Sequence, residues 1–133
     1  MSKNIAIILG EFHKKETTIM LEEARKIAKK NNLKIIEEIW VNGSYEKPLA
    51  LKRVLKKKNI AGAVLLGIIE RGETKHGMVM GQVVMEAVIR LELKFMKPVG
   101  IGIFGPEILP KQIPSRLLPH ARQAVLAVAK MLI

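Results

Sequence analysis

Four short apolar runs alternate along this chain with four segments whose apolar residues recur at helical spacing. The runs occupy residues 5–9, 33–41, 61–67 and 98–104, and a glycine closes or follows the first and the third. Short, β-branched apolar runs of this kind are typical of buried parallel strands. Because right-handed crossovers leave few other arrangements, the alternation predicts an α/β fold: a small parallel sheet with helices on both faces.

The segments between the strands predict four helices. Residues 14–31 form an amphipathic pattern, a second helix is predicted from Pro48 in its first turn to about Lys58, and a third begins near His76. The apolar face of the third helix is predicted to consist of Val83, Val84, Ala87, Val88 and Leu91. That of the last helix is predicted to consist of Ala121, Ala124, Val125, Val128 and Leu132. Four prolines between residues 105 and 119 predict a loop or a broken helical turn there.

The net charge and the residue composition limit the kinds of ligand and site that this protein can have. The chain carries a net charge of +11, from 23 Lys and Arg against 12 acidic residues, all of them Glu. Such a surface attracts anions, but only 4% of residues are aromatic, which disfavours stacking on nucleic-acid bases and favours phosphorylated small molecules. The absence of Cys excludes disulfides, zinc–thiolate sites and thiol catalysis. We expect one domain over residues 1–133, without a signal peptide or membrane span, in the cytoplasm.

Residues 67–76, which read GIIERGETKH, combine the end of a predicted strand with the start of a helix. Free backbone N–H groups and the positive end of the helix dipole favour a bound anion at such a turn, and phosphate is the obvious ligand. His76 would place a group that transfers protons near neutral pH beside that anion. The alternative is a capped helix with a surface histidine. Since ligands of parallel sheets bind at the carboxyl ends of strands, we expect the loops 10–13, 42–47, 67–76 and 104–106 to converge on one site.

Four segments in this order resemble the 6,7-dimethyl-8-ribityllumazine synthase family of riboflavin biosynthesis, especially its archaeal branch. They are Gly10-Glu11-Phe12, the VNGSYE stretch at 41–46, the Gly-Glu-Thr-x-His core at 72–76, and Pro98-Val99 followed by Gly102-Ile103 and Gly105-Pro106. The resemblance implies a three-layer flavodoxin-like sandwich with a four-stranded parallel sheet. It also implies condensation of 5-amino-6-(ribitylamino)uracil with 3,4-dihydroxy-2-butanone 4-phosphate, without metal or organic cofactor.

The resemblance further implies self-association into pentamers or larger assemblies, with active sites between neighbouring subunits and no nucleic-acid or membrane partner. Met78, Met80 and Met85 lie beyond one plausible core face of the third helix, as an interface requires. The alternative is that these adaptable side chains fill a core.

Matched position by position, the family pattern implies a role for each candidate residue. Phe12 would stack on the pyrimidine ring, although it could be an ordinary core residue. Ser44, Tyr45 and Glu46 would hold the ribityl chain, unless Glu46 belongs to a solvated loop. His76 would transfer protons. The phosphate would contact Gly72, Glu73, Thr74, Arg116 and Arg122, both arginines being otherwise surface charges. The remaining expected substrate-binding residues are His13, Gly67, Ile68, Ile69 and Ile101.

Several positions depart from the family pattern. His13 stands in place of an Asn, Asn42 in place of a Pro, and Gly77-Met78 in place of an aromatic–acid pair. Glu70 replaces an apolar residue beside the pocket, where an unpaired buried carboxylate would be costly.

Two other functions remain open from the sequence. A relative, the archaeal-type riboflavin synthase, has a similar subunit but lacks the Gly-Glu-Thr-x-His segment, and product analysis separates the two. A non-catalytic basic module would bind nucleic acid with a steep dependence on salt.

Overall fold

A computed structural model describes residues 3–132, which form one four-stranded sheet covered by helices on both faces. The strands are β1 (Lys3–Gly10), β2 (Leu33–Val41), β3 (Gly62–Glu70) and β4 (Val99–Ile108). All pair in parallel, in the order β2-β1-β3-β4, so β1 and β3 occupy the centre. The predicted α/β fold with a four-stranded parallel sheet is confirmed.

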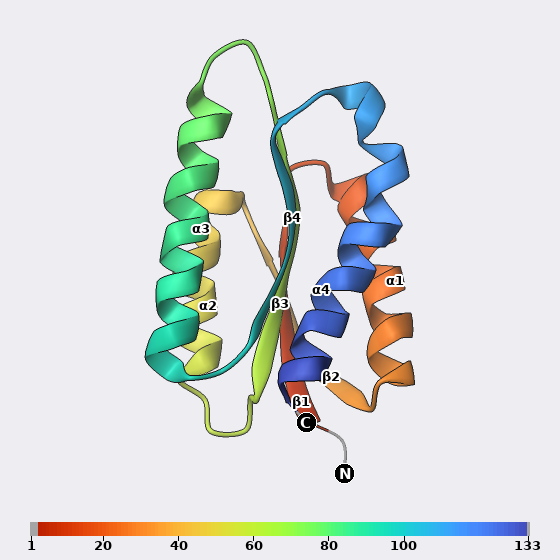
Figure 1. The fold of residues 1–133 in the computed structure, drawn as a ribbon, viewed down its shortest axis with the longest axis vertical. Coiled ribbons are helices and arrows are strands. Elements are labelled where there is room, and N and C mark those ends of the chain that lie inside the picture. The colour runs from red at the N-terminus through yellow and green to blue at the C-terminus, as the bar shows by residue number, and fades with distance from the viewer. Residues whose placement is uncertain (1–2, 133) are drawn as a thin grey trace.

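The helices divide into two layers. They are α1 (Lys14–Lys30), α2 (Lys47–Leu55), α3 (His76–Phe95) and α4 (Leu117–Met131). In Figure 1, α2 and α3 cover one face of the sheet and α1 and α4 cover the other. The loops after β3 and β4 lie together at the upper end of the molecule in this view, where the strands have their carboxyl ends.

Alternation along the central strands builds a separate core on each face. In β1, Ile5, Ile7 and Leu9 face α1 and α4, whereas Ala6 and Ile8 face α2 and α3, and all five are fully buried. Strands buried on both faces read as continuous apolar runs, which is why the sequence identified β1 and β3 so readily. The apolar residues predicted for α1 and for residues 121–128 of α4 are buried as expected, and Leu132 packs against the same core.

Two strands are longer than the sequence indicated. β3 continues through Ile68 and Ile69 to Glu70, and β4 continues past Phe104 to Ile108. The extensions pair with each other beyond a register irregularity, with Glu70 opposite Ile108. Residues 105–108 are therefore strand, which corrects the predicted loop, because backbone pairing outweighs the local preference of a Gly-Pro sequence. The other prolines behave as expected: Pro110 and Pro114 begin 3-10 turns, and Pro119 lies in the first turn of α4.

One predicted core position of α3 is wrong. Val84 and Val88 are buried, but Val83 is 54% exposed. Adjacent helical residues point about 100° apart, and α3 is oriented so that Val84 points to the sheet and Val83 to the solvent side. Of the other predicted residues, Ala87 and Leu91 are partly buried, and Leu91 packs against the core. Met80 and Met85 pack against the core between sheet and helices, as the alternative interpretation of the methionines proposed.

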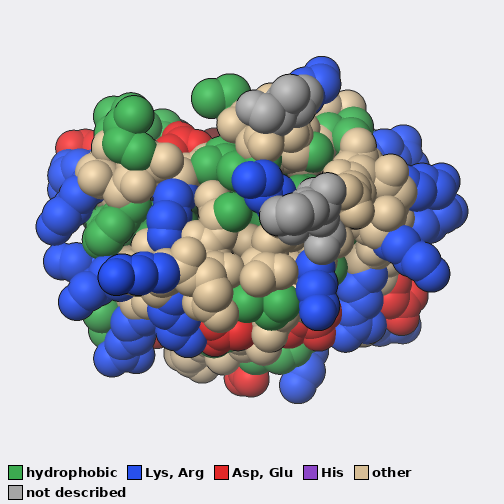
Figure 2. Space-filling model, turned by 90° about the horizontal axis from the view of Figure 1, so that it is seen from below, with side chains coloured by type: hydrophobic (Ala, Val, Ile, Leu, Met, Phe, Trp, Pro, Cys, Tyr) green, Lys and Arg blue, Asp and Glu red, His purple; other side chains and the backbone are tan. Residues whose placement is uncertain are grey.

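The molecular surface carries its positive charge broadly. Figure 2 shows the end at which the strands begin, with Lys and Arg side chains on both sides of this face and Glu side chains among them. Within residues 3–132, no helix combines the length and apolar character needed to cross a bilayer.

Candidate active site

A cavity of about 470 Å³ opens where β1, β2 and β3 end. It is lined by Phe12 from the first loop, residues 42–46 from the second, and residues 68–72, Thr74 and His76 from the third, with Gly77 and Met80 of α3 behind them. Three of the four loops expected to converge therefore do so. The fourth lines a different cavity, described below.

The aromatic side chains of this cavity are exposed to it. Phe12 is 70% exposed, and its ring meets that of His13 edge-on, with 5.5 Å between the ring centroids. Phe12 is thus not a core residue, which removes the alternative interpretation of this position. Tyr45 is 48% exposed and lies edge-on to His76, with 5.9 Å between the centroids. The cavity consequently offers a flat apolar surface and, from α3, an imidazole beside a phenol.

The 42–46 loop is ordered by its own hydrogen bonds. The backbone N–H of Glu46 donates to the carbonyl of Gly43 at 3.2 Å in a single 3-10 turn, Ser44–Glu46. The backbone N–H of Gly43 in turn donates to Oε1 of Glu46 at 2.8 Å and caps this turn. Glu46 is therefore part of the turn and not a freely solvated side chain. Ser44 is buried, whereas Tyr45 and Glu46 are exposed. This arrangement leaves polar groups at one wall of the cavity, suitable for a row of hydroxyls.

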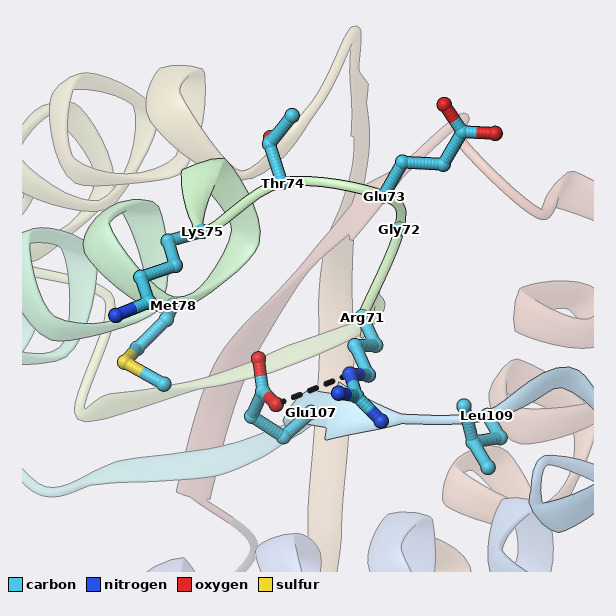
Figure 3. A pocket seen from close by; sticks show the side chains of 8 residues that line it. All are labelled: Arg71, Gly72, Glu73, Thr74, Lys75, Met78, Glu107 and Leu109. Carbon is cyan, nitrogen blue, oxygen red and sulfur yellow. Dashed lines mark ion pairs between the residues drawn. The ribbon is translucent and has the colours of Figure 1, made fainter.

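The turn between β3 and α3, where the phosphate site was predicted, is shaped by a glycine and a threonine. Gly72 adopts a φ of +65°, which favours glycine, and the backbone N–H of His76 donates to Oγ1 of Thr74 at 3.2 Å where α3 begins. On the other side of this turn lies a second cavity of about 420 Å³ (Figure 3). Its Arg71 and Glu107 side chains point toward each other, with 3.3 Å between Nε and Oε2, whereas Glu73 points away.

Two departures from the family pattern face each other. Nε2 of His13 and Oε2 of Glu70 are 3.8 Å apart, so the carboxylate that looked unpaired in the sequence has an imidazole neighbour. His13 adopts a left-handed backbone conformation with φ 59° ahead of α1, and its Nε2 is buried without a hydrogen bond. Glu70 lines the cavity, whereas His13, which was predicted to bind substrate, does not.

Six predicted site residues do not line this cavity. They are His13, Gly67, Glu73, which lines the second cavity, Ile101, Arg116 and Arg122. Nη1 of Arg116 donates to the carbonyl of Gln112 at 2.8 Å, and Arg116 lines a separate cavity of about 360 Å³ with Phe104 and His120. His120 stacks on Phe104 with 4.9 Å between centroids, and burial together with the neighbouring Arg116 lowers the pKa of His120.

Two more of these residues are engaged in packing or pairing. Arg122 binds Oε2 of Glu23 through Nε and Nη2, at 3.0 and 2.8 Å, and so joins α4 to α1. Ile101 is partly buried in β4 and packs against the core beneath α2 and α3. Gly67 lies in β3 directly before Ile68, which lines the cavity.

Lys47 is a buried lysine that the local sequence did not identify as a candidate. Its side chain is 1% exposed, its Nζ donates to Oγ of Ser44 at 3.4 Å, and burial lowers the pKa of Lys47 to about 8 from 10.5. In the sequence, a lysine between Glu46 and Pro48 at the start of a helix has the character of a surface charge. Only the orientation of α2 against the sheet places it inside.

Comparisons with known proteins agree over nearly the whole chain. The sequence model of the 6,7-dimethyl-8-ribityllumazine synthase family matches residues 2–133. A 6,7-dimethyl-8-ribityllumazine synthase of Staphylothermus marinus is 37% identical over 128 residues, which cover 96% of this chain and 85% of that protein. Proteins of the same name from Metallosphaera sedula and Methanococcus vannielii are 36% and 33% identical, covering 98% and 96% of this chain and 86% and 91% of theirs.

Proposed function

This chain belongs to the 6,7-dimethyl-8-ribityllumazine synthase family, and we infer from that membership that it is the transferase of riboflavin biosynthesis named by its relatives. It condenses 5-amino-6-(ribitylamino)uracil with 3,4-dihydroxy-2-butanone 4-phosphate to 6,7-dimethyl-8-ribityllumazine, releasing phosphate and water. The observation that supports this reaction best is the cavity in which Phe12, the 44–46 turn and His76 meet beside the 72–74 turn.

We propose that the cavity divides between the two substrates. The uracil ring stacks on Phe12, since this exposed ring offers a flat apolar face. The ribityl hydroxyls bind along Ser44, Tyr45 and Glu46. The phosphate of the second substrate binds at residues 72–74, just before the amino terminus of the 20-residue helix α3, because the positive end of a helix dipole favours an anion. This arrangement brings the ring amine and the ketone together, and such condensations depend mainly on proximity and orientation.

His76 is proposed to transfer the protons of the reaction. His76 is the first residue of α3, its imidazole is exposed, and the ring of Tyr45 lies next to it. Addition of the amine to the ketone moves one proton from nitrogen to oxygen, and loss of water moves another. A neutral imidazole near pH 7 can accept and return both.

We further propose that the assembly is at least a pentamer and that Arg116 serves the phosphate of a neighbouring subunit's site. The hydrogen bonds of Arg116 are to neutral groups, the Gln112 carbonyl and the Ser115 hydroxyl, so its charge remains available for an anion. Arg122 is a weaker candidate because Glu23 already binds its guanidinium. A cytoplasmic location stays a prediction from composition.

The direct test mixes the purified protein with both substrates and follows formation of the lumazine chromophore. We expect the lumazine from two substrates, whereas riboflavin from two lumazines would identify the relative's activity. His76→Ala should lower turnover about 10²- to 10⁴-fold, with butanone phosphate binding changed little. Full turnover of His76→Ala across the pH range would remove His76 from the proton transfers.

A further inference from the structure

Lys47 carries a buried charge that the proposed reaction does not yet use. Its side chain is 1% exposed, and an ammonium group has three N–H donors, of which one reaches an acceptor, Oγ of Ser44 at 3.4 Å. Within residues 3–132, no carboxylate forms an ion pair with Lys47. Burial is also the sole cause of its lowered pKa, so no neighbouring carboxylate stabilises the charge.

The backbone around Lys47 is shaped to admit this side chain. Its ammonium lies between Gly10 at the end of β1 and Gly67 in β3, the two central strands. A β-carbon at Gly10 would stand 3.2 Å from Nζ, and one at Gly67 would overlap Nζ outright. Two adjacent strands thus lack side chains where the ammonium ends, so it occupies a built position and not a chance gap.

This position is directly beneath the substrate cavity. Ser44, the hydrogen-bond partner of Lys47, lines the cavity, and so does Ile68, which follows Gly67. Phe12, the proposed stacking surface for the uracil ring, lies two residues beyond Gly10. The second cavity, along the phosphate turn, is lined by none of these residues. The buried charge therefore lies at the end of the site proposed for the uracil substrate, next to the turn proposed for its ribityl chain, and not at the second cavity.

An ammonium without a counter-charge is expensive to bury, since it gives up its hydration for one long hydrogen bond. An apolar side chain such as Met would fill the same volume without that cost. The missing partner that would offset it is negative charge in the cavity above. The substrate proposed for this end is a uracil, whose ring N–H is weakly acidic and whose anion spreads its charge over ring nitrogens and carbonyl oxygens.

We propose that Lys47 is a positioning residue for the uracil substrate: it holds the Ser44 hydroxyl and supplies the positive charge that favours the ring-deprotonated anion of the bound heterocycle. This inference rests on the proposed function. On binding, a ring N–H bond breaks, its electron pair stays on the ring, and the proton passes to bulk solvent. The anionic ring donates electron density to its amino group, which becomes a better nucleophile toward the ketone.

The test is titration calorimetry with 5-amino-6-(ribitylamino)uracil alone, in two buffers of different protonation enthalpy, which yields both the affinity and the protons released. Inorganic phosphate is titrated separately as the probe of the phosphate end of the site.

The variants are Lys47→Met and, as a matched control, Lys52→Met, which removes the same charge from an exposed position on the same helix. Lys47→Met should bind the uracil about tenfold more weakly, as expected for losing a charged hydrogen-bonding group, and release no proton. Its phosphate affinity should change less than twofold.

Several results would overturn the proposal. One is release of no proton when the parent binds the uracil, a measurement that needs no variant to fold. Another is uracil affinity of Lys47→Met within twofold of the parent. Equal losses of uracil and phosphate affinity would indicate a merely structural role. A parent that binds and deprotonates the uracil but forms no lumazine when the second substrate is added would refute the reaction and leave the role of Lys47 intact. A parent that does not bind the uracil would refute both.

Discussion

Phe12 has a large apolar ring that is 70% exposed on the wall of the cavity. In the free protein this ring contacts water, so burying it would be favourable. A bound planar ring recovers that burial by stacking. Phe12→Ala should therefore raise the Michaelis constant for the uracil substrate several-fold, since such stacking contributes about 1 kcal/mol, and leave that for butanone phosphate nearly unchanged. Steady-state kinetics with each substrate varied in turn measures this. Equal increases for both substrates would point to a structural role for Phe12.

Burial of Lys47 should make the folding stability of the protein depend on pH. Its pKa is lowered by burial to about 8 in the folded protein, against 10.5 when exposed. Below pH 8 the amine is charged in both the folded and unfolded states, so the full cost of burying the charge is present. Between pH 8 and 10.5 the unfolded chain binds the extra proton, so stability rises with pH, and above 10.5 the cost is gone.

Lys47→Met should accordingly be more stable than the parent at pH 7, by on the order of 3 kcal/mol, with the difference shrinking toward pH 10. Chemical unfolding of both proteins at the two pH values gives this difference, and Lys52→Met is again the control. A difference that does not depend on pH would mean that burial does not lower the pKa of Lys47, because the folded and unfolded chains would then bind the same number of protons.

At the scale of elements, the start of α4 carries two arginines with different surroundings, Arg116 in the turn before the helix and Arg122 within it. Arg122 is bound by Glu23, whose side chain is 9% exposed, and the pair fastens α4 to α1. Arg116, just before α4, has only neutral partners among the residues described. The two arginines that the family resemblance implied together as phosphate ligands thus have different local environments.

Alanine substitutions should separate these environments. Arg122→Ala leaves the buried Glu23 carboxylate unpaired, and should cost about 1–3 kcal/mol of folding stability without changing phosphate affinity. Arg116→Ala should weaken inorganic phosphate and butanone phosphate, because a permanently charged planar fork suits phosphate oxygens, and should change stability little. Thermal unfolding and phosphate titration of both variants check this. If Arg122→Ala were the one to lose phosphate affinity, the proposed roles would be exchanged.

At the scale of the whole molecule, α3 presents an apolar face with no partner in the chain described. Val79, Val83 and Leu93 are 52%, 54% and 67% exposed, and Ile89 and Met96 continue the same side of the helix. These residues, and not the methionines singled out in the sequence, form the surface that the proposed pentamer would bury. The exposed Glu86–Arg90 ion pair lies among these residues on the same side of the helix. Exposed apolar residues gathered on one side of a helix are typical of a protein interface.

A charge in this face should disrupt assembly. We expect light scattering of the active parent to give at least a pentamer, and Val83→Glu to give smaller species with much lower turnover, since a buried unpaired carboxylate opposes association. Glu22→Gln, at an exposed position of α1 in the other helical layer, is the control and should assemble normally. A fully active parent monomer, or a Val83→Glu variant that still assembles, would contradict the proposed interface.

Much of this protein follows from local pattern. Continuous apolar runs identified β1 and β3, periodic apolar residues identified α1 and α4, and together they predicted the parallel sheet and the edge at which the cavity lies. These features could be predicted because the periodicity of strands and helices appears in residues that are close together in the sequence. The segments 10–13, 42–47 and 67–76 could be assigned to one site because the carboxyl ends of parallel strands share an edge.

Other features exist only because distant segments meet. The pairing of β3 with β4 extends both strands to Glu70 and Ile108, His13 faces Glu70, and Arg122 faces Glu23, none of which has a signal in local sequence. Lys47 shows the difference most clearly. Its charge predicts a surface position, but the docking of α2 onto the sheet directs its side chain between two glycines of separate strands. Burial and electrostatic environment are sums over all neighbours in space, so they are decided by the tertiary structure alone.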